Sequence, residues 1–313
     1  MGVGRVAALK GVGVMVDVRT AAFELLDVAS RDQLGEGPWW SVAEQRLYWV
    51  DILSHRVRSS DLDGQDFMCF CAPSEVGFVV PDVAGDLVLG LRGGLGRLDP
   101  VTGVVQVGVQ VDDRDDHRLN DGKTDRAGRL WFGSMHLPET QPTSRFYRID
   151  KSGVATVFDN IITSNGLGWS PDNSVMYYTD SKTWQIKAFD FDASTGVMSN
   201  PRVFAEDPTG EYVPDGLTVD AEGCVWGAKW QGSRVIRYAP DGRVLLDLRF
   251  PVARMTSCMF VGSRLDTLAI TSACGPADDE PLAGRVFLID PGTTGIGETA
   301  VSAEVLANVT TQC

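Results

Sequence analysis

Hydrophobic and polar positions alternate in a pattern that recurs along the chain. Each copy has a Gly-containing start, a short apolar stretch, a polar turn with Asp, Gly or Asn, and a second apolar stretch. Four clear copies are EGPWWSVAEQRLYWVD, NDGKTDRAGRLWFGSM, NGLGWSPDNSVMYYTD and DGLTVDAEGCVWGAKW, and two weaker copies are GFVVPDVAGDLVLGL and CMFVGSRLDTLAITSA. Short apolar runs bounded by such turns predict β-strands joined as hairpins.

The copies form a regular repeat. They begin at six positions spaced 40 to 50 residues apart: Gly37, Gly77, Gly122, Gly166, Gly216 and Cys258. Copies continue into a third strand such as RVIRYAPDG and a fourth such as VATVFD. Repeats of this length indicate stacked supersecondary units. The sequence therefore predicts an all-β fold, a six-bladed β-propeller with four-stranded antiparallel blades around a central channel.

Chain length and composition indicate the domain organisation. The chain has 313 residues, 43% of them hydrophobic, which is enough for a large core. We expect a single propeller domain over residues 23–313, preceded by an N-terminal extension over residues 1–22. The chain contains no apolar run of the roughly 20 residues that a membrane helix requires.

Net charge and cysteine spacing limit the classes of binding partner and the cellular compartment that we expect. The formal net charge is −14 and the sequence has no basic cluster, which argues against nucleic acid or an anionic membrane as a partner. The six cysteines are scattered without C-x-x-C spacing, which is typical of a protein in the reducing cytoplasm. We expect a cytoplasmic monomer or weak homo-oligomer.

The first strand of each propeller blade lines the channel, so residues at the start of these strands should converge at one mouth. The residue before each aligned position, here called the opening residue, is Glu36, Val76, Asp121, Asn165, Asp215 and Ser257 in turn. Asn-Gly and Asp-Gly are common turn dipeptides, but Glu is a poor turn former. Acidic groups brought together repel unless a cation lies between them. The pattern favours a site for one divalent cation.

Several of these stretches resemble the regucalcin/gluconolactonase family of six-bladed propeller lactonases. The resemblance covers about residues 23–292 and rests on LGEGPWW, HRLNDGKTDRAGRLWFGSM, SNGLGWSPDNSVMYYTD and VPDGLTVDAEGCVW. It implies that Glu36, Asn165 and Asp215 coordinate the cation, and that Arg118 and Asn120 contact the substrate. It also implies a catalytic role for Asp215. After GSM, no residue aligns with an acidic substrate contact that some relatives carry.

The chemistry of these residues agrees with the implied roles. Glu36, Asn165 and Asp215 offer only oxygen, which suits Ca²⁺, Mg²⁺ or Mn²⁺. Related lactonases also accept zinc and iron(II), so the metal stays open. A cation can polarise an ester carbonyl and lower the pKa of a bound water. Asp215 is then a base, a ligand or both.

The expected function is metal-dependent hydrolysis of an aldono-1,4- or 1,5-lactone to the aldonic acid. The alternatives are a related propeller esterase or phosphotriesterase with a non-sugar substrate, and a noncatalytic calcium-binding propeller. A strictosidine-synthase-like condensing enzyme shares the architecture but should not need the Glu, Asn and Asp set. We also expect Trp39, Trp40, Trp131 and Trp226 to pack between blades, and Trp184 and Trp230 to lie near the active face.

Overall fold

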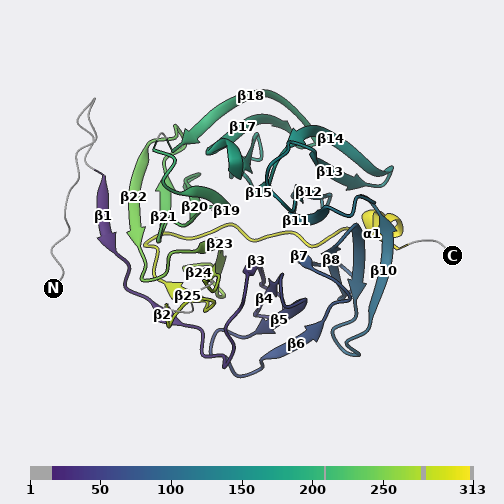
Figure 1. The fold of residues 1–313 in the computed structure, drawn as a ribbon, viewed down its shortest axis with the longest axis horizontal. Helices are drawn as coiled ribbons and strands as arrows, with labels where there is room; N and C mark the ends of the chain where they lie inside the picture. Colours follow the sequence, from purple (N-terminus) through teal and green to yellow (C-terminus); the bar gives the residue numbers. More distant parts are fainter. Residues whose placement is uncertain (1–15, 208, 276–279, 311–313) are drawn as a thin grey trace.

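The strands surround a central axis as six separate sheets (Figure 1). The computed structural model describes residues 16–207, 209–275 and 280–310. In this part of the chain, five sheets have four strands and one has five. The prediction of a six-bladed β-propeller is therefore confirmed. We number the blades 1 to 6 in the order of their innermost strands.

The first three blades are each built from four consecutive strands. Blade 1 contains β3 (Gly35–Ser41), β4 (Arg46–Asp51), β5 (Arg56–Ser60) and β6 (Met68–Cys71). Blade 2 contains β7 (Val76–Pro81), β8 (Leu87–Leu91), β9 (Gly94–Leu98) and β10 (Val105–Gln110). Blade 3 contains β11 (His117–Thr124), β12 (Leu130–His136), β13 (Ser144–Asp150) and β14 (Gly153–Ile161).

The last three blades include the N-terminal strands. Blade 4 contains β15 (Ser164–Trp169), β16 (Val175–Asp180), β17 (Gln185–Asp192) and β18 (Val197–Glu206), with the short helix η1 (Ser181–Thr183) between β16 and β17. Blade 5 contains β19 (Val213–Val219), β20 (Val225–Trp230), β21 (Arg234–Tyr238), β22 (Val244–Arg249) and β1 (Asp17–Thr20). Blade 6 contains β23 (Met255–Val261), β24 (Thr267–Ser272), β25 (Phe287–Ile289) and β2 (Glu24–Leu25).

The N-terminal strands join blades that are far away in sequence. β2 pairs with β25 and completes blade 6, so the two ends of the ring are held together by hydrogen bonds. β1 pairs in parallel with β22 on the outside of blade 5. The first fifteen residues of the expected N-terminal extension lie outside the described residues.

The innermost strand of every blade is irregular near its opening residue. The register with the second strand shifts between Glu36 and Trp39 in blade 1, and between Asn165 and Leu167 in blade 4. The other four innermost strands shift at the corresponding place. A β-bulge bends a strand and redirects its side chains. The opening residues therefore share one local geometry.

The Asn-Gly and Asp-Gly dipeptides at the opening positions lie inside strands rather than in turns. A Cβ atom on Gly166 would lie 2.6 Å from the Asp215 carbonyl oxygen, and one on Gly216 would lie 2.1 Å from Ser257 Oγ. Both distances are shorter than van der Waals contact. Glycine at these positions lets the innermost strands of neighbouring blades approach each other.

In two blades, a buried tryptophan of the second strand donates a hydrogen bond to an aspartate in the turn after the innermost strand. In blade 3, Trp131 Nε1 donates to Asp125 Oδ2 at 2.9 Å, and in blade 5, Trp226 Nε1 donates to Asp220 Oδ2 at 2.9 Å. Each of these two indole rings also lies beneath an arginine. Both rings are buried, which agrees with the packing role expected for them.

The C-terminal strap, defined as residues 292–302, crosses the face of the ring (Figure 1). It forms a bridge to blade 5 at Asp220 and Gly295, and one to blade 2 at Asp82 and Val301. It leads into α1 (Ala303–Val309), which buries Val305 and Val309 against blades 2 and 3. No helix in the described residues is long and apolar enough to cross a membrane.

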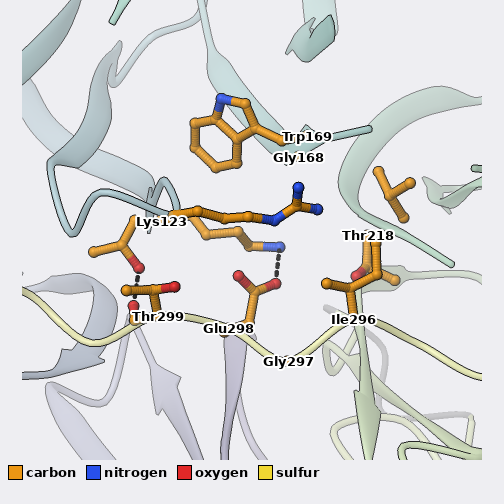
Figure 2. A pocket seen from close by; sticks show the side chains of 11 residues that line it. Lys123, Gly168, Trp169, Thr218, Ile296, Gly297, Glu298 and Thr299 are labelled. Carbon is orange, nitrogen blue, oxygen red and sulfur yellow. Dashed lines mark hydrogen bonds and ion pairs between the residues drawn. The ribbon is translucent and has the colours of Figure 1, made fainter. Parts of the chain in front are cut away.

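The strap covers one mouth of the channel. It encloses a small cavity of about 30 Å³ against the ends of β11, β15 and β19. There Glu298 of the strap pairs with Lys123 Nζ at 3.5 Å, as Figure 2 shows. The Thr124 hydroxyl donates to the Thr299 carbonyl oxygen. This end of the channel, which we call the lower mouth, is thus covered by the chain itself.

Candidate active site

A cavity of about 300 Å³ lies where the innermost strands begin, at the end we call the upper mouth. Its lining includes all five residues predicted for the site: Glu36, Arg118, Asn120, Asn165 and Asp215. They come from β3, β11, β15 and β19, so four blades contribute. Each of the five is 6 to 7% exposed. The other three opening residues do not line this cavity.

Two of the lining residues are buried carboxyl groups close to each other. Burial raises the pKa of Glu36 to about 8, and the nearby Asp121 carboxylate adds to the rise. Burial also raises the pKa of Asp215 well above its usual value, with further contributions from Glu36 and Asp121. Both groups are therefore unfavourable as bare anions.

The surroundings of these two carboxyl groups fit a cation. The Gly37 N–H donates to Glu36 at 2.8 Å, and Asp215 also forms a side-chain hydrogen bond with Glu36. A hydrogen bond between two carboxyl groups requires a proton on one of them, so the fully ionised pair needs a positive charge beside it. A divalent cation held by Glu36, Asp215 and the amide oxygen of Asn165 would supply that charge.

The composition of this set also matters. Within the described ranges, no three or more His, Cys, Asp and Glu side chains are grouped so as to hold a metal ion. A metal site with three protein ligands in this part of the chain would therefore include another kind of donor. Asn165 offers an amide oxygen, and an all-oxygen set favours a hard cation.

Hydrogen bonds link the predicted substrate contacts to the predicted metal ligands. Arg118 Nη1 donates to Asn120 Oδ1 at 2.6 Å. Asn120 Nδ2 donates to the Ser164 carbonyl oxygen at 2.6 Å and to Asn165 Oδ1 at 3.0 Å. These buried contacts orient the guanidinium and both amides.

Arg118 keeps part of its hydrogen-bonding capacity for a ligand. Burial lowers the pKa of Arg118 to about 10, so the guanidinium stays charged at neutral pH. Its Nη1 group is engaged by the Leu119 carbonyl oxygen and by Asn120. The described residues provide no hydrogen-bond acceptor for its Nε and Nη2 groups, which remain able to bind oxygen atoms in the cavity.

Glu139 is a lining residue that the sequence alignment missed. It follows the GSM stretch, where no acidic substrate contact could be aligned. Its backbone has φ of 53°, in a turn closed by its N–H and the His136 carbonyl oxygen. Lys182 Nζ lies 2.8 Å from its carboxylate, and the Thr163 hydroxyl donates to it at 3.2 Å. An acidic residue thus reaches the cavity from a turn whose length the sequence motif does not fix.

The lining of the cavity also includes apolar side chains. These are Leu34, Ile52, Leu53, Met135, Val213 and Trp230. The place expected for Trp230 is therefore confirmed, whereas Trp184 does not line the cavity. A ligand that carries both hydroxyl and C–H groups matches this mixed lining.

Comparison with known proteins assigns a family. The SMP-30/Gluconolactonase/LRE-like region matches residues 34–274. Regucalcin of Danio rerio is 35% identical over 280 residues, which are 86% of this chain and 93% of the relative. The pentonolactonase XacC of Haloferax volcanii is 35% identical over 274 residues, covering 84% of this chain and 92% of the relative.

A solved structure agrees with this assignment. It is a regucalcin from Agrobacterium tumefaciens, described as a calcium-binding protein, with a TM-score of 0.86 and 27% identity. The match covers 91% of this chain and 98% of that structure. On the breadth of these matches, the chain belongs to the SMP-30/gluconolactonase/LRE-like family.

Proposed function

We propose that this protein is a metal-dependent lactonase that hydrolyses an aldono-1,4- or 1,5-lactone to the aldonic acid. The observation that carries the proposal is the convergence of Glu36, Asn165 and Asp215 with Arg118 and Asn120 in one cavity. The name of the Haloferax relative, a pentonolactonase, supports a sugar lactone as the substrate class. Which lactone is used, and which of Ca²⁺, Mg²⁺, Mn²⁺, Zn²⁺ or Fe²⁺ is bound, are questions for the experiment below.

Substrate recognition is assigned to the polar lining residues Arg118 and Glu139. Arg118 can donate from Nε and Nη2 to ring or chain hydroxyl oxygens, and Glu139 can accept from a hydroxyl. Trp230 can pack against the C–H face of the ring, because aromatic side chains bury apolar surface well. These contacts would hold the lactone with its carbonyl group towards Glu36 and Asp215.

The reaction needs a proton acceptor and a proton donor at the same place. When bound, the cation supplies polarisation of the ester carbonyl and a lowered pKa for the attacking water. The Asp215 carboxylate accepts a proton from the water as its oxygen bonds to the carbonyl carbon. The bond from that carbon to the ring oxygen then breaks, and Asp215 returns the proton to the ring oxygen. The products are one carboxyl and one hydroxyl group on an open chain.

The test measures acid release from a panel of aldonolactones by metal-stripped protein after addition of each of the five cations. Hydrolysis that depends on one cation and is absent from Asp215→Asn is the expected result. A folded, metal-loaded protein without hydrolysis of any lactone in the panel would overturn the proposal.

A noncatalytic calcium-binding role is a second candidate. Its support is the Agrobacterium structure, which is described as a calcium-binding protein. That role predicts tight binding of Ca²⁺ with no turnover of any lactone. Under the lactonase proposal, turnover accompanies metal binding.

A further inference from the structure

Ser181 joins two of the predicted metal-ligand segments although it offers no ligand itself. It is 3% exposed and begins the short helix η1 of blade 4. Its Oγ lies 2.7 Å from the Pro214 carbonyl oxygen of blade 5 and 2.9 Å from Asn165 Nδ2 of its own blade. Its backbone N–H is fixed separately by the Thr163 carbonyl oxygen at 3.0 Å.

The chemistry of these two contacts sets the direction of both hydrogen bonds. A carbonyl oxygen can only accept, so the single hydroxyl proton of Ser181 must point to Pro214. The remaining lone pairs of Oγ can only accept, and an amide NH₂ group is the part of Asn165 that can donate. Ser181 therefore discriminates between the two ends of the Asn165 amide.

The opposite side of this amide has the matching arrangement. Asn120 Nδ2 donates to Asn165 Oδ1, and Asn120 is held in turn by Arg118. If the Asn165 amide rotated by half a turn, its NH₂ group would face the donor of Asn120. The oxygen would then face away from that donor, towards Ser181.

We propose that Ser181 is a positioning residue that fixes the Asn165 amide with its oxygen towards the metal ligands Glu36 and Asp215. The inference rests on the proposed metal site and names a determinant of it. By accepting from Asn165 and donating to Pro214, Ser181 also ties blade 4 to the residue that directly precedes Asp215. Residues that orient metal ligands in this way influence metal affinity without touching the metal.

The test measures Mn²⁺ binding to the metal-stripped full chain by titration calorimetry. Ser181→Ala is expected to weaken Mn²⁺ binding about 10-fold or more. Ser181→Thr keeps the hydroxyl and should stay within about 3-fold of the unchanged protein. Ser60→Ala is the matched control, because Ser60 is a buried serine of β5 outside the cavity.

A second background tests the orientation itself. Asn165→Asp has an oxygen at both ends of the side chain, so it has no wrong orientation to prevent. In that background, adding Ser181→Ala should change Mn²⁺ affinity by less than about 2-fold. Thermal unfolding of each variant, measured without metal, separates loss of binding from loss of folding.

The outcomes divide clearly. Ser181→Ala with Mn²⁺ affinity within 2-fold of the unchanged protein would overturn the inference, as would equal losses in Ser181→Ala and Ser181→Thr. If Ser181→Ala does not fold, Ser181→Thr is added to the Asn165→Asp variant instead. A loss of Mn²⁺ affinity relative to Asn165→Asp alone would then overturn the inference. If the unchanged protein binds none of Ca²⁺, Mg²⁺, Mn²⁺, Zn²⁺ and Fe²⁺, both the metal site and the inference fail. Cation binding without hydrolysis of any lactone with any of these five cations would defeat the lactonase proposal alone.

Discussion

The two mouths of the channel use the same three strands, β11, β15 and β19, but treat charge in opposite ways. At the upper mouth, Glu36 and Asp215 are buried like charges with raised pKa values. At the lower mouth, Lys123 is matched by Glu298 and by the Leu217 carbonyl oxygen at 3.2 Å. The buried charge at the lower mouth is compensated within the chain, whereas the two buried carboxyl groups at the upper mouth favour a bound cation.

This difference indicates that cation binding is assigned to one mouth and the stability of the fold to the other. A buried charge that is paired within the chain is already compensated and destabilises the fold only if its partner is removed, whereas buried like charges favour the binding of a cation. Four changes are expected to affect the two mouths differently.

The largest effect is expected for Asp215→Asn. The variant keeps the side-chain volume but removes the proposed base, so kcat for lactone hydrolysis should fall about 10²- to 10⁴-fold. Without metal, its free energy of unfolding above pH 8 should rise by on the order of 1 kcal/mol, because a buried repulsion with Glu36 is removed. Steady-state kinetics and denaturant unfolding measure the two changes.

Glu298→Gln is the control for that prediction, because it removes one carboxylate from the other mouth. Its kcat should stay within about twofold of the unchanged protein. Equal losses of kcat in both variants would show that the two mouths are not functionally distinct.

The next effect concerns pH. The pKa of Glu36 is raised to about 8, so below pH 8 the carboxylic acid must lose a proton before it can bind a cation. Metal affinity should therefore rise with pH, with about a 50-fold loss between pH 8 and pH 6 from the Glu36 proton alone, and the raised pKa of Asp215 should keep the affinity rising above pH 8. Calorimetry in buffers of different ionisation enthalpy measures the proton release. Affinity that is constant from pH 6 to pH 9 would be inconsistent with this site.

A smaller effect on stability is expected at the lower mouth. Glu298→Gln leaves buried Lys123 without its anionic partner, so the free energy of unfolding should fall by about 1–3 kcal/mol. Denaturant unfolding measures the change. The double variant Lys123→Met with Glu298→Gln should lose less than the sum of the two single variants. Additive losses would mean that the pair does not interact.

The smallest effect is expected for Lys182→Met. Lys182 holds Glu139 at the rim of the cavity and is partly exposed, so its loss should raise KM for the lactone about 2- to 5-fold with kcat nearly unchanged. The matched control is Lys151→Met, because Lys151 is exposed in blade 3 and does not line the cavity. An equal change of KM in both variants would remove Glu139 from the set of substrate contacts.

Much of this architecture could be predicted from the sequence because it is repetitive and local. The turns and apolar runs of one blade recur in the others, and the opening residues Glu36, Asn165 and Asp215 stand at the same place in each repeat. The structure brings these three residues into one cavity, while their roles as ligands stay predictions.

Other features depend on contacts that the local pattern does not carry. β2 has only two residues, and it completes blade 6 through pairing with a strand more than 250 residues away. The strap has bridges but no strand pattern of its own. Glu139 reaches the cavity through a left-handed turn, and Ser181 acts through hydrogen bonds across two blades. None of these follows from apolar periodicity.

The C-terminal strap closes one end of the central channel, so that the cavity opens at the upper mouth. Because residues 296–299 lie across the floor, substrate entry and product departure share the rim near Leu53 and Lys182. Under the proposed function, the aldonate would leave at the same rim at which the next lactone enters. The C-terminal strap would then constrain turnover by preventing passage along the channel axis.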